Sequence, residues 1–196
     1  FSHTMIELRA PVDVWIDIDV SGSMNGAKFQ NAMTVAVAIA VAAAKTRTLN
    51  CTVAIRDSGQ DIAQIAILYD SKKQRIQQFL DVVPQIGCNG GTPEGLCFEA
   101  VKDEILKKAH GSRKFFINLS DGEPCHSFTH KGQQYTYGGE KAAEHTRNMM
   151  REMRAAGIAV LSYYVEEGIR PGNEHTNFKR MYGEDARFID PRHIND

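Results

Sequence analysis

The stretch that decides the fold is VDVWIDID, Val12–Asp19, which runs directly into the short polar segment Val-Ser-Gly-Ser, Val20–Ser23. Apolar side chains dominate the first segment, and three aspartates interrupt it. A strongly apolar run of this length, closed by a polar turn that contains glycine, is typical of a strand buried in a parallel sheet. We therefore expect a central strand over Val12–Asp19 whose carboxyl end opens onto a loop.

Strands and helices alternate along the rest of the chain. The expected strands are Val12–Asp19, Cys51–Arg56, Ala63–Tyr69, Lys114–Leu119, Ile158–Val165 and Arg187–Ile189. The expected helices are Ala27–Lys45, Lys72–Val82, Glu94–Lys108, Glu140–Ala155 and Asn173–Tyr182. The turn Asp57–Asp61 is short enough for an antiparallel hairpin. This pattern predicts one α/β domain over residues 1–196, doubly wound, with a mainly parallel central sheet, one antiparallel edge strand and helices on both faces.

The composition is that of an ordinary globular domain. Of the 196 residues, 42% are hydrophobic and 24% are charged, and the net charge of −1 gives no global basic field for nucleic acid or an anionic membrane. The longest apolar run, Val35–Ala44, is shorter than the roughly 20 residues that cross a bilayer, so we expect a buried helix. Four cysteines and the absence of a signal-peptide pattern over Phe1–Arg9 favour a cytoplasmic location. The first residue is Phe1 rather than Met, which is consistent with a piece of a longer chain.

Oxygen-bearing side chains gather where the expected strands end. The first strand ends at Asp19 and is followed by Ser21 and Ser23, a later strand is followed by Asp121, and Thr92 immediately precedes a helix. In a doubly wound sheet, ligands bind beyond the carboxyl ends of the strands, so these five residues should share one edge. Hydroxyls and carboxylates suit a hard cation such as Mg²⁺, which prefers oxygen ligands and keeps some of its waters.

These residues stand in three motifs, Asp-x-Ser-x-Ser at 19–23, Gly-Gly-Thr-Pro at 90–93 and Ser-Asp-Gly at 120–122. Together they resemble the metal-ion-dependent adhesion site of von Willebrand factor A domains, and the resemblance covers Val12 to Val165. It implies that Ser21, Ser23 and Thr92 bind Mg²⁺, or Mn²⁺ or Ca²⁺, directly. It also implies that Asp19 and Asp121 act partly through water, and that an acidic side chain of a partner protein completes the coordination.

Within that family, Gly-Gly-Thr-Pro and Ser-Asp-Gly-Glu-Pro resemble the intracellular branch, which includes the cobalt and magnesium chelatase subunits and the nitric-oxide-reductase activation proteins. The stretch YGGEKAAEHTR, Tyr137–Arg147, is most similar to the cobaltochelatase subunit. The resemblance implies a MoxR- or chelatase-type AAA+ ATPase as partner. Because the chain has no Gly-x-x-x-x-Gly-Lys-Ser/Thr motif, it would be a non-catalytic adaptor, with cobalt insertion into a tetrapyrrole a property of the complex.

Two other functions stay open at this stage. An extracellular adhesion module predicts a secretory signal before Phe1 and oxidised cysteines. A metal-assisted hydrolase would use the cation to activate water, with His126 or Glu123 as the base. A zinc site built from Cys88, Cys97, Cys125, His126 and His130 matches no standard spacing, so we expect exposed histidines in a polar loop and buried thiols.

Three further expectations concern the surroundings of the site. Asp17 lies in a central strand, where a carboxylate needs a partner, and we expect a structural ion pair with Arg56 on the neighbouring strand. Residues 122–139 are expected to form a long binding loop, whose aromatic side chains either make a partner-facing rim or cap the loop's own small core. In this family a carboxy-terminal helix can shift with ligand, and residues 173–182 are the candidate for that helix here.

Overall fold

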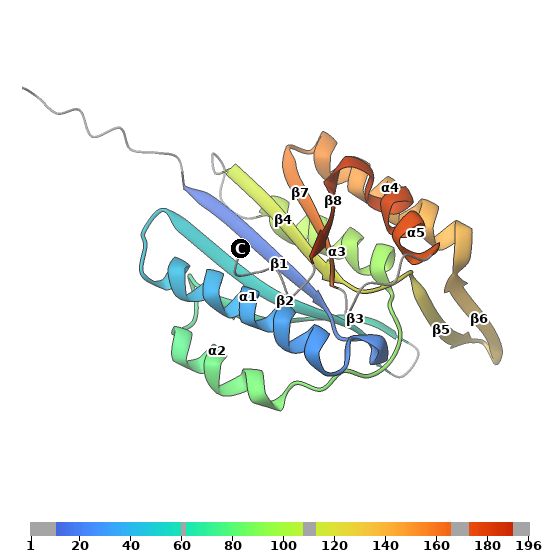
Figure 1. The fold of residues 1–196 in the computed structure, drawn as a ribbon, viewed down its shortest axis with the longest axis horizontal. Helices are drawn as coiled ribbons and strands as arrows, with labels where there is room; N and C mark the ends of the chain where they lie inside the picture. The colour runs from blue at the N-terminus through green and yellow to red at the C-terminus, as the bar shows by residue number, and fades with distance from the viewer. Residues whose placement is uncertain (1–10, 60–61, 108–112, 166–172, 190–196) are drawn as a thin grey trace, which may run out of the picture.

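A twisted six-stranded sheet runs through the middle of the molecule (Figure 1). The computed structural model describes residues 11–59, 62–107, 113–165 and 173–189. The strands, in their spatial order, are β3 (Ile62–Asp70), β2 (Leu49–Gly59), β1 (Val12–Asp19), β4 (Arg113–Ser120), β7 (Ile158–Val165) and β8 (Ala186–Ile189). β3 pairs antiparallel with β2, whereas all other neighbours in this sheet are parallel. The predicted doubly wound, mainly parallel sheet with one antiparallel edge strand is confirmed.

Helices cover both faces of the sheet, and each face has its own apolar core (Figure 1). On one side lie α1 (Ala27–Ala44) and α2 (Ile76–Val82). On the other side lie α3 (Glu94–Lys107), α4 (Gly139–Ala155) and α5 (Asn173–Tyr182). Met149, Met150 and Met153 of α4 fill part of the second core.

α1 is the one helix in the described ranges that is long and apolar enough to cross a membrane, judged by length and composition alone. Its mean hydropathy is 1.4 over 18 residues. In the fold its alanine-rich face packs on the sheet, where Ala36 and Ala40 are fully buried. A helix that covers a core passes the same test, so this feature is weak evidence for a membrane span.

α2 begins four residues later than the predicted start at Lys72, and the reason is a turn built around Asp70. The Asp70 carboxylate accepts a hydrogen bond from the main-chain N–H of Lys72 (3.0 Å), and the Gln74 side chain accepts one from the main-chain N–H of Asp70 (2.7 Å). These side-chain hydrogen bonds hold residues 71–74 in a non-helical turn. The helix starts after Arg75, whose N–H is bonded by the side chain of Gln78 at 2.9 Å.

A two-stranded ribbon replaces the irregular loop predicted over residues 122–139, so that prediction was wrong. β5 (Cys125–His130) and β6 (Gln133–Gly138) pair antiparallel around Lys131 and Gly132, whose φ angles are 51° and 76°. Two successive residues with positive φ match the twist of a two-residue hairpin turn. Lys131 is a residue that rarely adopts this conformation, which is why the turn is not visible in the sequence.

The fold predicts that Phe98 is essential to the core under α3. This side chain is fully buried and packs edge-to-face on Phe116, with the ring centroids 5.1 Å apart. Phe98→Ala should lower the free energy of unfolding by about 3–5 kcal/mol in urea denaturation. Leu106→Ala on the same helix, where the side chain is 39% exposed, should change it by about 0.5 kcal/mol or less. Equal losses in the two variants would contradict this placement of α3.

Candidate metal centre

The five predicted oxygen ligands all lie at the carboxyl-end edge of the sheet. Asp19 ends β1, Ser21 and Ser23 lie in the turn that follows, Thr92 precedes α3, and Asp121 follows β4. The last four line one open hollow of about 490 Å³. Asp19 lies behind Ser21 and is fully buried. The structure therefore brings the five residues together, with four at the surface of the hollow and one beneath it.

Main-chain hydrogen bonds join the two loops that carry the hydroxyl groups. The N–H of Asn89 bonds the carbonyl oxygen of Val20 at 2.8 Å, and the N–H of Gly22 bonds the carbonyl oxygen of Gly90 at 3.2 Å. Gly90 has a φ of +77°, and a Cβ there would lie 2.9 Å from the carbonyl oxygen of Ser58. Only glycine meets both constraints, so this residue allows the Thr92 loop to approach the end of β1.

The oxygen atoms of the site are already spaced like neighbouring ligands of one small cation. The Ser21 and Ser23 hydroxyls lie 3.1 Å apart, and the Ser23 hydroxyl donates to Asp121 Oδ1 at 2.8 Å. Octahedral Mg²⁺ holds its ligands at about 2.1 Å, which places adjacent ligands about 3 Å from one another. Behind them, Asp19 accepts hydrogen bonds from the N–H of Ser21 (2.8 Å) and the hydroxyl of Ser120 (3.0 Å). The donor set and its spacing fit a hard divalent cation.

A lysine that the sequence reasoning missed lies at the mouth of the hollow. Lys28, in the first turn of α1, places Nζ 2.5 Å from Asp121 Oδ2 and 3.4 Å from the main-chain oxygen of Ser23. Its ammonium group therefore contacts the same carboxylate that is predicted to serve the cation. No motif marks this residue, because the contact joins α1 to the loop after β4 across 93 positions of sequence.

Beneath the site, the guanidinium group of Arg56 is fully buried among carboxylates. Nη1 lies 2.6 Å from Asp17 Oδ2, which confirms the predicted ion pair. Nη2 lies 2.8 Å from Glu94 Oε1 and 3.7 Å from Asp19 Oδ2, and the group also lies over the ring of Phe98 at 5.2 Å. Arg56 thus links Asp19, the buried aspartate of the candidate site, to the first residue of α3.

Glu94, Asn118 and Tyr182 extend this buried network to α5, and the sequence reasoning missed all three. The Asn118 side-chain amide donates to the Tyr182 hydroxyl at 2.9 Å and lies 3.4 Å from Glu94 Oε1. Burial and the neighbouring Glu94 raise the pKa of Tyr182 well above its usual range, so its hydroxyl stays protonated. A glutamate at the start of a helix is common because the helix dipole favours a negative charge there, so no sequence pattern indicates that Glu94 is buried.

The charges of the centre leave an excess of negative charge. Burial raises the pKa of Asp17, Asp19 and Glu94, and Arg56 opposes that rise in each case. Although burial disfavours a charged guanidinium, the three carboxylates raise the pKa of Arg56 above its already high ordinary value. With Asp121 included, four carboxylates face the two cationic groups that the described residues place against them, Arg56 and Lys28. A divalent cation is the charge that would neutralise this group.

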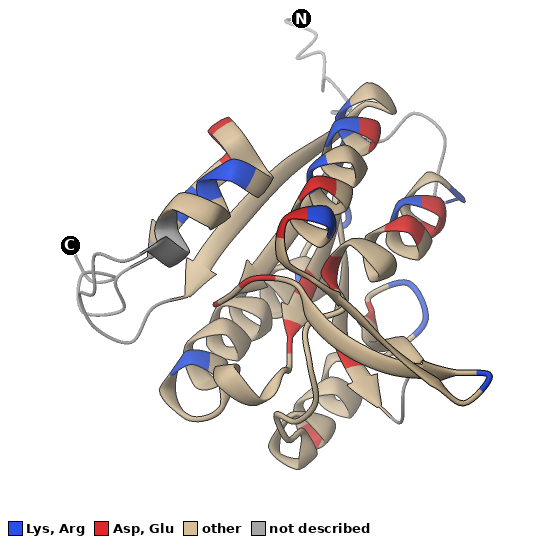
Figure 2. Cartoon of the chain, turned by 90° about the vertical axis from the view of Figure 1, so that its right-hand side faces the viewer, with Lys and Arg blue, Asp and Glu red and all other residues tan. Residues whose placement is uncertain are grey.

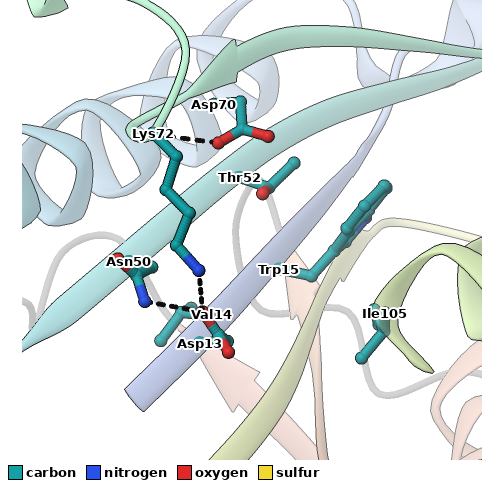
Figure 3. Close-up of a pocket in the computed structure, with 8 residues that line it drawn as sticks. All are labelled: Asp13, Val14, Trp15, Asn50, Thr52, Asp70, Lys72 and Ile105. Carbon is teal, nitrogen blue, oxygen red and sulfur yellow. Dashed lines mark hydrogen bonds and ion pairs between the residues drawn. The ribbon is translucent and has the colours of Figure 1, made fainter. Parts of the chain in front are cut away.

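A second polar cluster lies at the opposite end of the sheet, and its carboxylates are already paired (Figure 3). Asp13 accepts hydrogen bonds from the Asn50 amide (2.7 Å) and the Lys72 ammonium (3.4 Å), while Asp70 lies 3.7 Å from the Lys73 ammonium. The cavity among these side chains has a volume of about 10 Å³, which is no larger than one water molecule needs. This cluster stabilises the strand ends rather than forming a second ligand site.

The Cys and His residues do not form a zinc site in the described ranges, where no three His, Cys, Asp or Glu side chains converge as metal ligands. His126 was expected to be exposed but is only 3% exposed, because its ring stacks on Phe128 at 5.6 Å. None of the four cysteines forms a disulfide. Burial, with the carboxylates of the metal site nearby, raises the pKa of Cys88 to about 11, which makes it a poor metal ligand near neutral pH.

The aromatic side chains of the ribbon lie in two different environments. Tyr137 folds back on α4, where its hydroxyl lies 3.0 Å from His145 Nδ1, and burial raises its pKa to about 12. His145 is therefore half-buried rather than a surface residue. Phe128 and Tyr135 stack with their centroids 5.5 Å apart on the outer part of the ribbon, and Tyr135 is 43% exposed.

No known protein-family profile and no curated protein sequence matches this chain. Solved structures do match it. The vWF domain of the type V pili tip protein Mfa5 from Porphyromonas gingivalis aligns with a TM-score of 0.71 and 11% identity, over 94% of this chain and 91% of that domain. The pilus adhesin SpaC from Lactobacillus rhamnosus GG aligns with a TM-score of 0.67 and 14% identity, over 92% of this chain and 28% of the adhesin.

The manganese-loaded TRAP protein of Plasmodium vivax aligns with a TM-score of 0.61 and 13% identity, over 92% of this chain and 68% of that protein. At these identities the matches show the fold alone. The chain therefore has the fold of a von Willebrand factor A domain, and it spans only a little over a quarter of the length of the pilus adhesin.

The ion cluster predicts a large stability cost for removing Arg56. Arg56→Met should lower the free energy of unfolding by about 3–5 kcal/mol, because it leaves Asp17 and Glu94 buried without their cation. Arg113→Met, which removes an exposed arginine of β4, should change it by about 0.5 kcal/mol or less. Urea denaturation of the metal-free variants makes the comparison, and a loss below about 1 kcal/mol for Arg56→Met would contradict the cluster.

The same cluster predicts how this cost depends on pH. A carboxyl whose pKa is raised by folding stabilises the folded state at low pH, and that contribution is lost as the pH rises above its ordinary value, 3.8 for Asp17. Protonated carboxyls need no counter-charge, so the cost of Arg56→Met should be smaller at pH 5 than at pH 8. A cost that grows toward pH 5 would show that Arg56 does not act through these carboxylates.

Proposed function

We propose that this chain is a divalent-cation-dependent protein-binding domain. Ser21, Ser23 and Thr92 hold Mg²⁺, or in its place Mn²⁺ or Ca²⁺, while Asp19 and Asp121 act partly through water. The cation presents a positive charge at the open hollow, to which a carboxylate of a partner protein binds. The observation that carries the proposal is the set of hydroxyl and carboxylate oxygens 2.8–3.1 Å apart, beside carboxylates that outnumber their cationic partners.

We further propose a AAA+ ATPase of the MoxR or chelatase type as the partner, in the cytoplasm, with this chain as its non-catalytic adaptor. The support for this finer assignment is the similarity of Gly-Gly-Thr-Pro, Ser-Asp-Gly-Glu-Pro and Tyr137–Arg147 to the cobaltochelatase subunit. In such a complex, the assembled ATPase and adaptor together, and not this chain alone, would insert cobalt into a tetrapyrrole.

An extracellular adhesion module is the second candidate, and the comparisons favour it as an alternative. Two of the similar structures, SpaC and Mfa5, are described as a pilus adhesin and a pili tip protein. The hydrolase alternative has less support, because one of its two candidate bases, His126, is buried against Phe128. The other, Glu123, lines the hollow.

Calorimetric titration with Mg²⁺ and Mn²⁺ tests the cation site directly. Thr92→Val removes one hydroxyl ligand while keeping the side-chain shape, and it should weaken Mg²⁺ binding at least about tenfold. Thr136→Val makes the same change at an exposed position of β6 and should leave the affinity unchanged. Equal affinities for the two variants would contradict the ligand assignment.

Affinity capture from a lysate of the source organism tests the partner. Wild-type protein in Mg²⁺ should retain a AAA+ ATPase that is absent with EDTA and absent with Asp19→Ala. An ATPase retained regardless of metal would show that the interface lies elsewhere. No ATPase under any condition would contradict the adaptor assignment and leave the adhesion alternative.

Lys28 should compete with the cation for Asp121, so its removal should tighten metal binding. We expect Lys28→Met to raise the affinity for Mg²⁺ about tenfold, because the variant no longer places an ammonium group 2.5 Å from that carboxylate. Lys45→Met, at the far end of α1, is the matched control and should have no effect. Weaker Mg²⁺ binding by Lys28→Met would show that the lysine supports the site instead of competing.

A further inference from the structure

The outer edge of β5 is a strand edge that leads into the candidate metal centre. Cys125 exchanges two main-chain hydrogen bonds with Thr92, at 3.0 and 2.6 Å, on the side of β5 that faces away from β6. Alternate residues of a strand direct their N–H and C=O groups to the same side. The N–H and C=O groups of Ser127 and Thr129 therefore point to the same edge as those of Cys125.

Among the described residues, only Thr92 pairs with the outer edge of β5 through main-chain hydrogen bonds. Thr92 pairs with Cys125, but at Gly90 the chain turns away toward Gly22, and the φ of +77° at Gly90 makes that turn possible. Beyond Cys125, no main-chain group of the described ranges is bonded to the outer edge of β5. Ser127 and Thr129 are both exposed. A short row of main-chain donors and acceptors is thus left open next to a proposed metal ligand.

We propose that this edge is the docking site for an extended segment of the partner protein, which adds to β5 as a third strand and carries the carboxylate that binds the cation. The inference rests on the proposed function and specifies how the partner is held. Strand addition at an exposed edge supplies affinity through main-chain hydrogen bonds, while alternate side chains supply specificity.

The strand register of the ribbon determines which position of the added segment would carry the acidic residue. A residue that pairs with Ser127 lies two strand positions from the one that pairs with Cys125, which is Thr92. That separation is about 7 Å along the strand, and because side chains alternate, the two side chains share one face. An aspartate or glutamate opposite Ser127 is therefore on the same face as the Thr92 hydroxyl and within reach of the hollow.

The chemistry of the ribbon suits an acidic, extended partner. Residues 125–138 contain no aspartate or glutamate, and their one lysine, Lys131, lies at the turn. Figure 2 shows the ribbon standing away from the body of the molecule, free of red along its length and blue at its tip. On the opposite face of the ribbon, the stacked rings of Phe128 and Tyr135 offer an apolar surface to the alternate side chains of the partner.

A displayed library of ten-residue peptides with one fixed glutamate tests the proposal. The library is selected on the wild-type chain in Mg²⁺ and eluted with EDTA, and the selected peptides are synthesised for fluorescence-anisotropy titration. Thr129→Pro removes an outward N–H of β5 and breaks no bond between β5 and β6, so it should weaken peptide binding at least tenfold. Thr136→Pro removes an outward N–H of β6 and should change binding less than twofold.

A second experiment tests strand addition on the wild-type chain, so it does not depend on whether a variant folds. Peptides N-methylated at the positions that bond β5 should lose binding to the wild-type chain, whereas peptides methylated at the intervening positions should keep it. Strand addition is overturned if metal-dependent peptides bind the Thr129→Pro variant and the wild-type chain with equal affinity and tolerate methylation at every position. That result would leave the proposed function standing. If calorimetry shows Mg²⁺ binding but no peptide elutes with EDTA, acidic-ligand binding at the cation is itself overturned.

Discussion

The buried guanidinium group of Arg56 is the interaction on which the rest of this structure depends. It binds Asp17 at 2.6 Å and Glu94 at 2.8 Å, and all three side chains are fully buried. Without it, carboxylates from β1 and α3 would be buried close to one another with no cationic partner, which is strongly unfavourable. A single side chain of β2 therefore fixes the end of the central strand and the start of the helix that follows the Thr92 loop.

The position of Arg56 also determines where the excess negative charge of these carboxylates lies closest to solvent. Arg56 is the only cationic group that the described residues place against Asp17 and Glu94, and it also lies near Asp19. The excess charge is closest to solvent at Asp121, which is 5% exposed and lines the hollow. The interior is thus incompletely neutralised on the side that opens outward, and this asymmetry favours a cation at the edge of the sheet over one inside it.

The parts of the structure that could be predicted from the sequence depend on local patterns. Val12–Asp19 and its polar turn identify a central strand and the loop at its carboxyl end, and period-two alternation puts Asp17 and Arg56 on the same face of neighbouring strands. The contacts of Lys28 and Tyr182 could not be predicted, because each joins elements that only the tertiary fold brings together. The β5–β6 ribbon was missed for a different reason, since its turn uses a positive φ at a lysine.

Thr92 connects the two features of the carboxyl-end edge, because it contributes its side chain to one and its main chain to the other. Thr92 lines the hollow, while its N–H and C=O bond Cys125 at the base of the ribbon. A displacement of this residue would change the lining of the hollow and the position of the ribbon together. The turn at Gly90 that brings Thr92 to this position needs glycine, since a Cβ there would lie 2.9 Å from the carbonyl oxygen of Ser58. The candidate metal centre and the open strand edge therefore form one continuous surface, because both include Thr92.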